Sequence, residues 1–253
     1  MVFETHRDMP DIEDGDTVLW RYVDLYRYMD LLQSSELHLT RADQMEDRWE
    51  GSYSTVNVSM RPTLYGKDWE MMSANTDGMY QFGRTHIYLN CWYVGSHESY
   101  AMWKLYDVTG KGVAIRTTAR RLKAALIGEH LPPLSGAQVQ YVDHATTFIP
   151  ETNLYFPYVH KRLSFSHENE YRLPGLWVPQ LLKVDEDDTA GRREPDIPPP
   201  FLRERVNVQQ LIEAVYVSPD SPEWVARVVS EVTHSYVLEL EVRHSDLAAD
   251  PVY

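Results

Sequence analysis

The run from Cys91 to Tyr106, rich in aromatic residues, constrains the fold of this chain more than any other segment. The apolar residues from Ile87 to Tyr93 predict a strand, and Gly95 lies in the break that follows. Ser96 or Ser99 can then cap a short helix. That helix carries three aromatic side chains on one face: Tyr100, Trp103 and Tyr106. Large aromatic groups are costly to expose, so each belongs either in the core or in a pocket that stacks a flat ligand, and the spacing leaves both readings open.

Composition indicates a globular protein with ample core material. The chain has 253 residues, of which 43% are apolar and 12% aromatic. Cys91 is the single cysteine, which excludes an internal disulfide and predicts a buried structural residue in a reducing compartment. No apolar stretch approaches the ~20 residues of a membrane helix, and the N-terminus lacks the order of a signal peptide. We therefore expect a cytoplasmic protein with no membrane partner.

The chain is strongly acidic, with a formal net charge of −14 and a pI near 5.1. This charge argues against a broad electrostatic grip on the phosphates of DNA or RNA. A small nucleotide remains a suitable partner, because a local basic group is enough to bind it. Composition does not determine the oligomeric state.

The hydrophobic pattern alternates between the periods of strands and helices along most of the chain. Strands are predicted over 18–23, 37–40, 87–93, 112–117, 138–142, 168–173, 201–206, 214–218 and 236–240, and helices over 24–32, 69–82, 119–127, 150–160 and 222–233. The order predicts an α+β fold, with a mixed, mainly antiparallel central sheet flanked by helices. We expect one domain over 18–253, preceded by an acidic N-terminal arm over 1–17. An acidic, proline-rich segment at about 185–200 is predicted to be an exposed, mobile loop.

Two clusters of acidic residues are candidates for chemistry. Glu168, Glu170 and Arg172 lie at a spacing of two, so in a strand their side chains share one face. The turn from Asp43 to Gly51 is the second cluster. Either cluster can also be an ordinary charged surface whose side chains pair with one another.

Six short segments together resemble the domain-of-unknown-function family 2971. They are Leu19-Trp-Arg-Tyr22, Leu31 to Leu37, Glu46-Asp-Arg-Trp-Glu-Gly51, Ala101-Met-Trp-Lys-Leu-Tyr106, Gly110-Lys-Gly-Val113 and His167-Glu-Asn-Glu-Tyr-Arg172. The resemblance covers about Val18 to Trp177 and implies membership of a family with no established activity. Arg48 and Trp49 depart from the Pro and Phe of the family's acidic turn, and the segment from Ser52 to Arg84 has no counterpart in its pattern.

Arg21, the segment Leu31 to Leu37, Tyr93 with Ser96 and Ser99, and Glu168-x-Glu170 follow one another along the chain. This order also resembles that of the ADP-ribosyltransferase fold. That likeness implies that NAD is bound, with Glu170 as the catalytic carboxylate and Glu168 orienting the acceptor. Arg21 would bind a phosphate or ribose of NAD, and Tyr93 or Trp103 would stack on the nicotinamide ring. The full set of ligand-binding candidates is Arg21, Tyr22, Tyr93, Ser99, Trp103, Tyr106 and Arg172. Asp47, Glu50 and Lys161 are expected to support them.

Two other functions remain open from the residues alone. Asp43, Asp47 and Glu50, joined by Glu168, Glu170 and Lys161, form a candidate carboxylate site for Mg²⁺ in a metal-dependent phosphodiesterase or nuclease. Alternatively, the same groups form a binding module for a nucleotide or a protein that turns nothing over. The histidines lack the spacing of metal ligands, so we expect no zinc site.

Overall fold

The computed structural model describes residues 2–107, 109–128, 132–178, 197–236, 239–249 and 251. Its helices are α1 (Leu25–Ser34), α2 (Thr55–Tyr65), α3 (Trp69–His86), α4 (Tyr100–Tyr106), α5 (Ala119–Ala125), α6 (Val208–Leu211) and α7 (Glu223–Tyr236). Its strands are β1 (Val18–Asp24), β2 (Glu36–Arg41), β3 (Ile87–Val94), β4 (Gly112–Thr118), β5 (Ala137–Gln138), β6 (Gln140–Val142), β7 (His160–Arg162), β8 (Glu170–Leu176), β9 (Phe201–Arg205), β10 (Ala214–Val217) and β11 (Glu241–His244).

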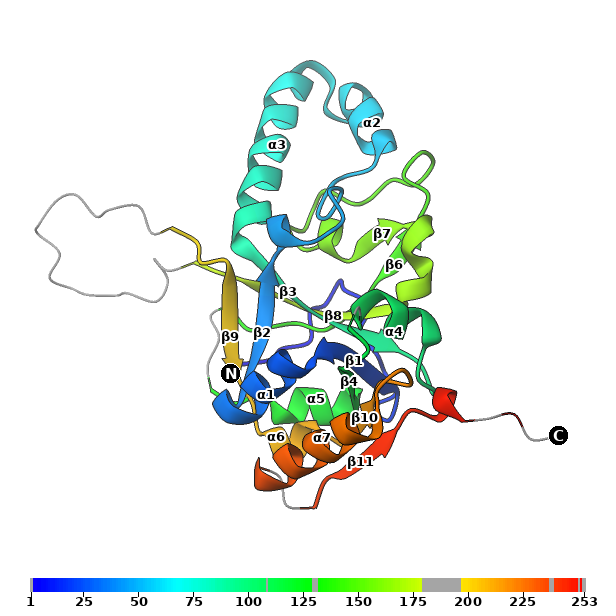
Figure 1. Cartoon of the computed structure of the whole chain (residues 1–253). Coiled ribbons are helices and arrows are strands. Elements are labelled where there is room, and N and C mark those ends of the chain that lie inside the picture. Colours follow the sequence, from blue (N-terminus) through cyan, green and yellow to red (C-terminus); the bar gives the residue numbers. More distant parts are fainter. Residues whose placement is uncertain are drawn as a thin grey trace, which may run out of the picture.

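One sheet organises the fold (Figure 1). Its strands follow the order β11-β10-β4-β1-β3-β2-β9, with β8 paired to β3 and β5 paired to β8. Every one of these pairings is antiparallel except that of β10 with β11. A separate parallel pair joins β6 and β7. The prediction of an α+β protein with a mixed, mainly antiparallel sheet is therefore confirmed.

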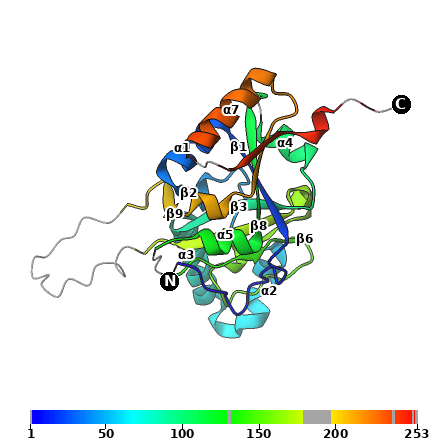
Figure 2. The same cartoon turned by 90° about the horizontal axis from the view of Figure 1, so that it is seen from below.

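The two faces of the sheet bury different clusters because side chains alternate along each strand. Leu19 and Trp92 point toward the main core, which is completed by apolar residues of α1, α5, α6 and α7. Trp20 and Tyr22 point to the opposite face, where α4 packs. Figure 2 shows α1 lying beside α7, and a hydrogen bond of 2.7 Å joins Tyr28 of α1 to Thr233 of α7.

The sheet opens at its centre, along one edge of β3. On its other edge, β3 pairs with β8 over seven residues. On the open edge, β3 pairs with β1 only through Tyr93 and Val94, and with β2 only through Tyr88 and Leu89. Residues 90–92 consequently face a gap between β1 and β2. The His38 carbonyl of β2 accepts hydrogen bonds from Asn90 at 2.8 Å and from Arg21 at 3.2 Å, so side chains bridge the gap.

Several predicted boundaries are corrected by the structure. Glu168 does not lie in a strand with Glu170, because it ends a 3-10 helix and Asn169 follows with a φ of 34°. Of the turn and helix expected over 150–160, the helix is only the short 3-10 helix Phe156–Tyr158, which includes a proline. Of the strand expected over 236–240, residues 237 and 238 lie outside the described residues, and the described ones are not in a strand. The helical spacing of buried Val225, Val229 and Thr233 continues to Tyr236, and β11 begins only at Glu241.

The sequence also predicted an N-terminal arm and a loop at 185–200. Val2 and Met9 of the N-terminal arm are buried, and Asp11 accepts hydrogen bonds from Lys123 and Tyr171. The arm therefore packs against the rest of the chain. Most of the predicted loop at 185–200 lies outside the described residues. No helix in the described ranges combines the length and the hydropathy that a membrane span needs.

Candidate functional site

A cavity of about 380 Å³ lies where β1 and β2 separate from β3. Its lining comes from β1, α1, β2, β3, α4, the turn around Glu50, and the segment that leads into β8. Nine of the predicted site residues are among its lining residues: Arg21, Tyr22, Asp47, Glu50, Tyr93, Tyr106, Lys161, Glu168 and Glu170. The antiparallel register brings Tyr93 and Glu170 to one face of the sheet, since Trp20 pairs with Tyr93 and Tyr93 pairs with Glu170 across three strands. Arg21 alternates with Trp20 and therefore projects from the other face, beside Trp92, so it shares the cavity only because the sheet is open between β1 and β3.

Arg21 provides the positive charge at one side of the cavity. Its Nη2 donates to the His38 carbonyl and its guanidinium lies 5.7 Å from the centre of the Trp92 ring, whereas its buried Nη1 has no hydrogen-bond partner. Burial lowers the pKa of Arg21 to about 10, so the group is still a cation at neutral pH. A buried guanidinium nitrogen without an acceptor is well suited to an anionic or carbonyl oxygen of a ligand.

Aromatic side chains form one wall. The Tyr22 ring meets the Tyr93 ring at 6.4 Å and the Trp103 ring at 4.9 Å, both edge to face. The Tyr22 hydroxyl accepts a hydrogen bond from the Ser99 amide at 2.6 Å, which fixes the start of α4 against β1. Tyr93 and Tyr106 are partly exposed and line the cavity, so their rings are available to a planar group.

Glu170 lies on the opposite side and is held by two cations. Arg172 donates to its carboxylate from Nε at 2.7 Å and from Nη2 at 3.1 Å, and Lys161 donates at 2.9 Å. Burial by itself would raise the pKa of Glu170. The charge of Arg172, the hydrogen bond from Glu168 and the charge of Lys161 outweigh burial and hold that pKa well below its usual range. Glu170 is therefore a buried, fixed negative charge at neutral pH.

Glu168 has the opposite electrostatic character. Burial, the hydrogen bond to Glu170 and the charge of Glu170 raise the pKa of Glu168 to about 8, although Lys161 also contacts it. At neutral pH Glu168 therefore carries a proton, which it shares with the Glu170 carboxylate. Two neighbouring carboxyl groups with separated pKa values are a common arrangement for acid and base chemistry.

The position of Arg172 corrects its predicted role. Its side chain is fully buried, and its nitrogens also donate to both oxygens of Glu50, at 2.6 and 3.1 Å, and to the Tyr158 carbonyl at 2.6 Å. With the two bonds to Glu170, all five N–H donors are used. Arg172 therefore does not contact a ligand. From beneath the cavity, it fixes the positions of Glu50 and Glu170, which line it.

Trp103 and Ser99 are corrected in the same way. Trp103 is 2% exposed, belongs to the cluster of Trp20 and Tyr22, and donates from Nε1 to Glu98 at 2.8 Å. It is a core residue that supports Tyr22, and the stacking role proposed for it is wrong. Ser99 caps α4, with its hydroxyl accepting from the Met102 amide at 3.4 Å. Neither residue lines the cavity.

The acidic turn is neutralised by arginines. Arg41 binds Asp43 at 2.7 Å, Arg162 binds Asp47 at 2.7 Å, and Arg172 binds Glu50. A cation site would need these carboxylate oxygens for the metal. Within the described ranges, no group of three or more His, Cys, Asp or Glu side chains is placed to hold a metal ion.

The sequence interpretation missed several groups of the site. Arg27 of α1 and Gln44 after β2 line the cavity, and the Tyr141 hydroxyl accepts from the Glu170 amide at 2.9 Å. Phe165 lies under the Lys161 ammonium, with 4.6 Å between the nitrogen and the ring centre. Asn90, which donates to the His38 carbonyl across the gap, was also missed. Its position could have been noticed in the sequence, since an amide in the middle of an apolar strand usually marks a buried hydrogen bond.

Cys91 was expected to be a buried structural residue, and it is only partly buried. It lies in β3 and lines the cavity. Burial and the charge of Glu170 raise the pKa of the Cys91 thiol, so the thiolate is not formed at neutral pH.

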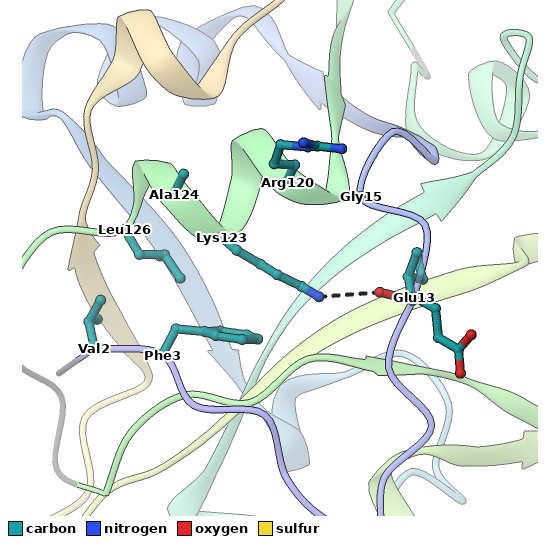
Figure 3. A pocket seen from close by; sticks show the side chains of 9 residues that line it. Val2, Phe3, Glu13, Gly15, Arg120, Lys123, Ala124 and Leu126 are labelled. Atoms are coloured by element: carbon teal, nitrogen blue, oxygen red, sulfur yellow. Dashed lines mark hydrogen bonds between the residues drawn. The ribbon is translucent and has the colours of Figure 1, made fainter.

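A larger hollow of about 630 Å³ lies elsewhere, between the N-terminal arm and α5 (Figure 3). Phe3 and Leu126 supply apolar surface, while Lys123 lies over the Phe3 ring at 5.4 Å and binds Asp11 at 2.7 Å. It contains none of the predicted site residues, and its basic groups already have acidic partners.

We expect the stability of the Glu168→Gln variant to differ from that of the wild type in a pH-dependent manner. The folded-state pKa of Glu168 is raised above its unfolded value. Its stabilising contribution is therefore complete below about pH 4.5 and is lost as the pH rises through about 8. Glutamine mimics the protonated acid at every pH, so the melting temperature of Glu168→Gln relative to wild type should rise between pH 5 and pH 9. A difference that is flat or falls over this range would contradict the assignment of the proton.

Comparisons with known proteins add little to this geometry. No protein-family model matches the chain and no curated protein matches it, so the resemblance to family 2971 stays a prediction. A solved structure, Thermus sp. 2.9 DarT in complex with carba-NAD+, is similar over 93% of this chain and 98% of that chain, at 12% identity and a TM-score of 0.38. A TM-score of this size does not establish a shared fold, so the function must follow from the site itself.

Proposed function

We propose that the protein is an NAD-dependent enzyme that transfers ADP-ribose. The observation that carries this proposal is that Arg21, Tyr93 and Glu170, from three different strands, line one cavity. A dinucleotide with a cationic nicotinamide ring needs these three kinds of group: a cation for phosphate, an aromatic ring for stacking and a buried carboxylate near the ribose.

The cation side of the cavity suits the diphosphate. Arg21 has an unpaired Nη1, and Arg27 lines the same wall from α1. A planar guanidinium binds phosphate oxygens bidentately, which an ammonium does not. The lysine in the lining, Lys161, already binds Glu168 and Glu170.

The carboxylate side suits cleavage of the bond between nicotinamide and ribose. As this bond breaks, its electron pair leaves with nicotinamide and positive charge develops on the ribose. Glu170, ionised and fixed by Arg172, would accept a hydrogen bond from a ribose hydroxyl and stabilise that charge. Glu168, with a pKa raised to about 8, would orient the acceptor. Its deprotonated form, populated as the pH approaches 8 and its own proton passes to water, would take the proton that the acceptor loses. The acceptor then forms the new bond to the same ribose carbon.

A thermal-shift titration tests this proposal. Saturating NAD should raise the melting temperature of the wild type, because a ligand at 100 times its Kd stabilises the folded state by about 2.7 kcal/mol. Arg21→Gln should lose most of the shift. Arg120→Gln is the matched control, since Arg120 is exposed, pairs with Asp16 and lies outside this cavity.

The same titration addresses the metal-dependent alternative. Mg²⁺ or Mn²⁺ should leave the melting temperature unchanged, because Asp43, Asp47 and Glu50 each have a cationic partner. A shift with either metal and none with NAD would favour the phosphodiesterase and refute the transferase.

A further inference from the structure

The hairpin of α2 and α3 extends away from the strands of the sheet (Figure 1). Its two helices are joined by an ion pair between Arg61 of α2 and Asp77 of α3, at 3.0 Å. Arg84, near the base of α3, donates to the Arg48 carbonyl at 3.3 Å. These contacts fix which side of α3 faces its own molecule.

The opposite side of α3 is rich in exposed apolar groups. Met71, Met72, Met79 and Phe82 are exposed by 59%, 39%, 52% and 41%, respectively. Large apolar side chains grouped on one helix face in this way usually mark an interaction surface. A helix that belonged to this chain alone would be expected to turn these side chains inward.

The spacing along α3 is that of a helix-pairing seam. Met72 and Met79 are seven residues apart, and so are Asn75 and Phe82. The next position of the first series, His86, already lies against Trp177 of its own chain, with 5.8 Å between the ring centres, and ends the seam. These positions follow the a and d places of a heptad, the repeat with which one helix packs against another. Asn75 is an exposed polar residue among the apolar ones.

The charged residues of α3 lie away from the seam. Glu70, Asp77 and Arg84 are also seven apart, but they occupy the f place of the heptad, farthest from the a and d places. The seam is therefore free of the charges that would have to lose water when a second helix packs on it.

The charge distribution indicates which partner fits this seam. The hairpin carries three basic residues (Arg61, Lys67, Arg84) and three acidic residues (Asp68, Glu70, Asp77), so the net charge of −14 resides on the rest of the chain. Two copies that met through most other surfaces would repel each other. The seam itself has no Asp, Glu, Lys or Arg, and a twofold axis allows one surface to pair with itself.

We propose that the protein forms a homodimer in which α3 pairs with α3 of a second copy in antiparallel orientation. The base of α3 leads directly into β3, so a parallel pair would place the two acidic bodies side by side. The antiparallel pair places them at opposite ends of a helix about 27 Å long. In this register Met72 packs on Phe82 of the second copy. Met79 packs on the stem of Asn75 of the second copy, whose amide group remains at the edge of the contact and keeps its water.

Sedimentation of the full chain over a dilution series tests the dimer. The wild type should change from twice to once its 29.5 kDa mass as it is diluted. Met79→Glu should raise the dissociation constant by roughly a hundredfold or more, because it buries an unpaired carboxylate. Met29→Glu is the matched control, since Met29 is 41% exposed on α1, and it should dimerise like the wild type.

Mixing two variants tests the orientation. Asn75→Lys and Met79→Glu should each be monomeric alone, yet form a heterodimer when mixed, because the antiparallel register places the new lysine opposite the new glutamate. The heterodimer has a second contact of this kind, and it is unchanged, because Met79 of the Asn75→Lys chain lies opposite Asn75 of the Met79→Glu chain. Failure of the mixture to associate would overturn the antiparallel register. A wild type that remains monomeric at every concentration would overturn the dimer, and a Met79→Glu variant that still dimerises would overturn the α3 interface. These results do not depend on the proposed enzymatic function.

Discussion

Replacing Glu170 with glutamine should lower turnover by about a hundredfold to a thousandfold, while NAD affinity changes little. Loss of one group that stabilises transition-state charge has an effect of this size. Glutamine retains the shape of the side chain but removes the charge that Arg172 and Lys161 hold in place. Release of nicotinamide reports turnover, and calorimetry reports binding.

Glu50→Gln is the comparator for this variant. Glu50 binds the other side of the Arg172 guanidinium, so its replacement removes a similar charge pair from the same arginine. We expect a loss of no more than roughly tenfold, because Glu50 has no proposed role in bond breaking. If the wild type binds NAD but neither the wild type nor the Glu50→Gln variant releases nicotinamide, the result would instead favour a binding module.

Replacing Arg172 with alanine should lower the free energy of unfolding by about 3–5 kcal/mol, the range for breaking a buried ion pair on one side. Arg172 is 0% exposed and is the cation for both Glu50 and Glu170, whose side chains are 1% and 7% exposed. Its removal leaves two buried carboxylates without their main partner. Urea unfolding followed by circular dichroism measures the change.

Arg162→Ala is the matched control for Arg172→Ala. Arg162 also binds a carboxylate of the acidic turn, Asp47 at 2.7 Å, but its side chain is 36% exposed. Water reaches this arginine, and the Asp47 carboxylate, although only 5% exposed, still accepts from the Trp49 amide, so the loss should cost about 1–2 kcal/mol, less than that of Arg172. If Arg172→Ala does not fold, Arg172→Lys retains a cation without the fork of donors and should fall between the two. Equal losses for Arg162→Ala and Arg172→Ala would contradict the role of burial.

The sequence by itself determined the elements with strong local patterns. The apolar run of β3, the alternation of β1 and β4, and the helical period of α1 and α7 are local properties, since each element buries one face whatever its partners are. The α+β fold class follows from their order. The sequence also indicated the residue types of the site, because arginine, tyrosine and paired glutamates at these positions suit the binding of a nucleotide.

Only the tertiary structure decided which of those residues share a cavity and which support it. Trp103 and Tyr106 lie on the same short helix, yet Trp103 is buried against Tyr22 while Tyr106 lines the cavity. Arg172 and Glu170 are two residues apart, but Glu50 of the acidic turn, 122 residues earlier in the chain, binds Arg172 from beneath. Such contacts depend on strand register and on the gap between β1 and β2, which arise from long-range pairing. Local periodicity carries no information about them, because it specifies the buried face of an element but not its neighbour.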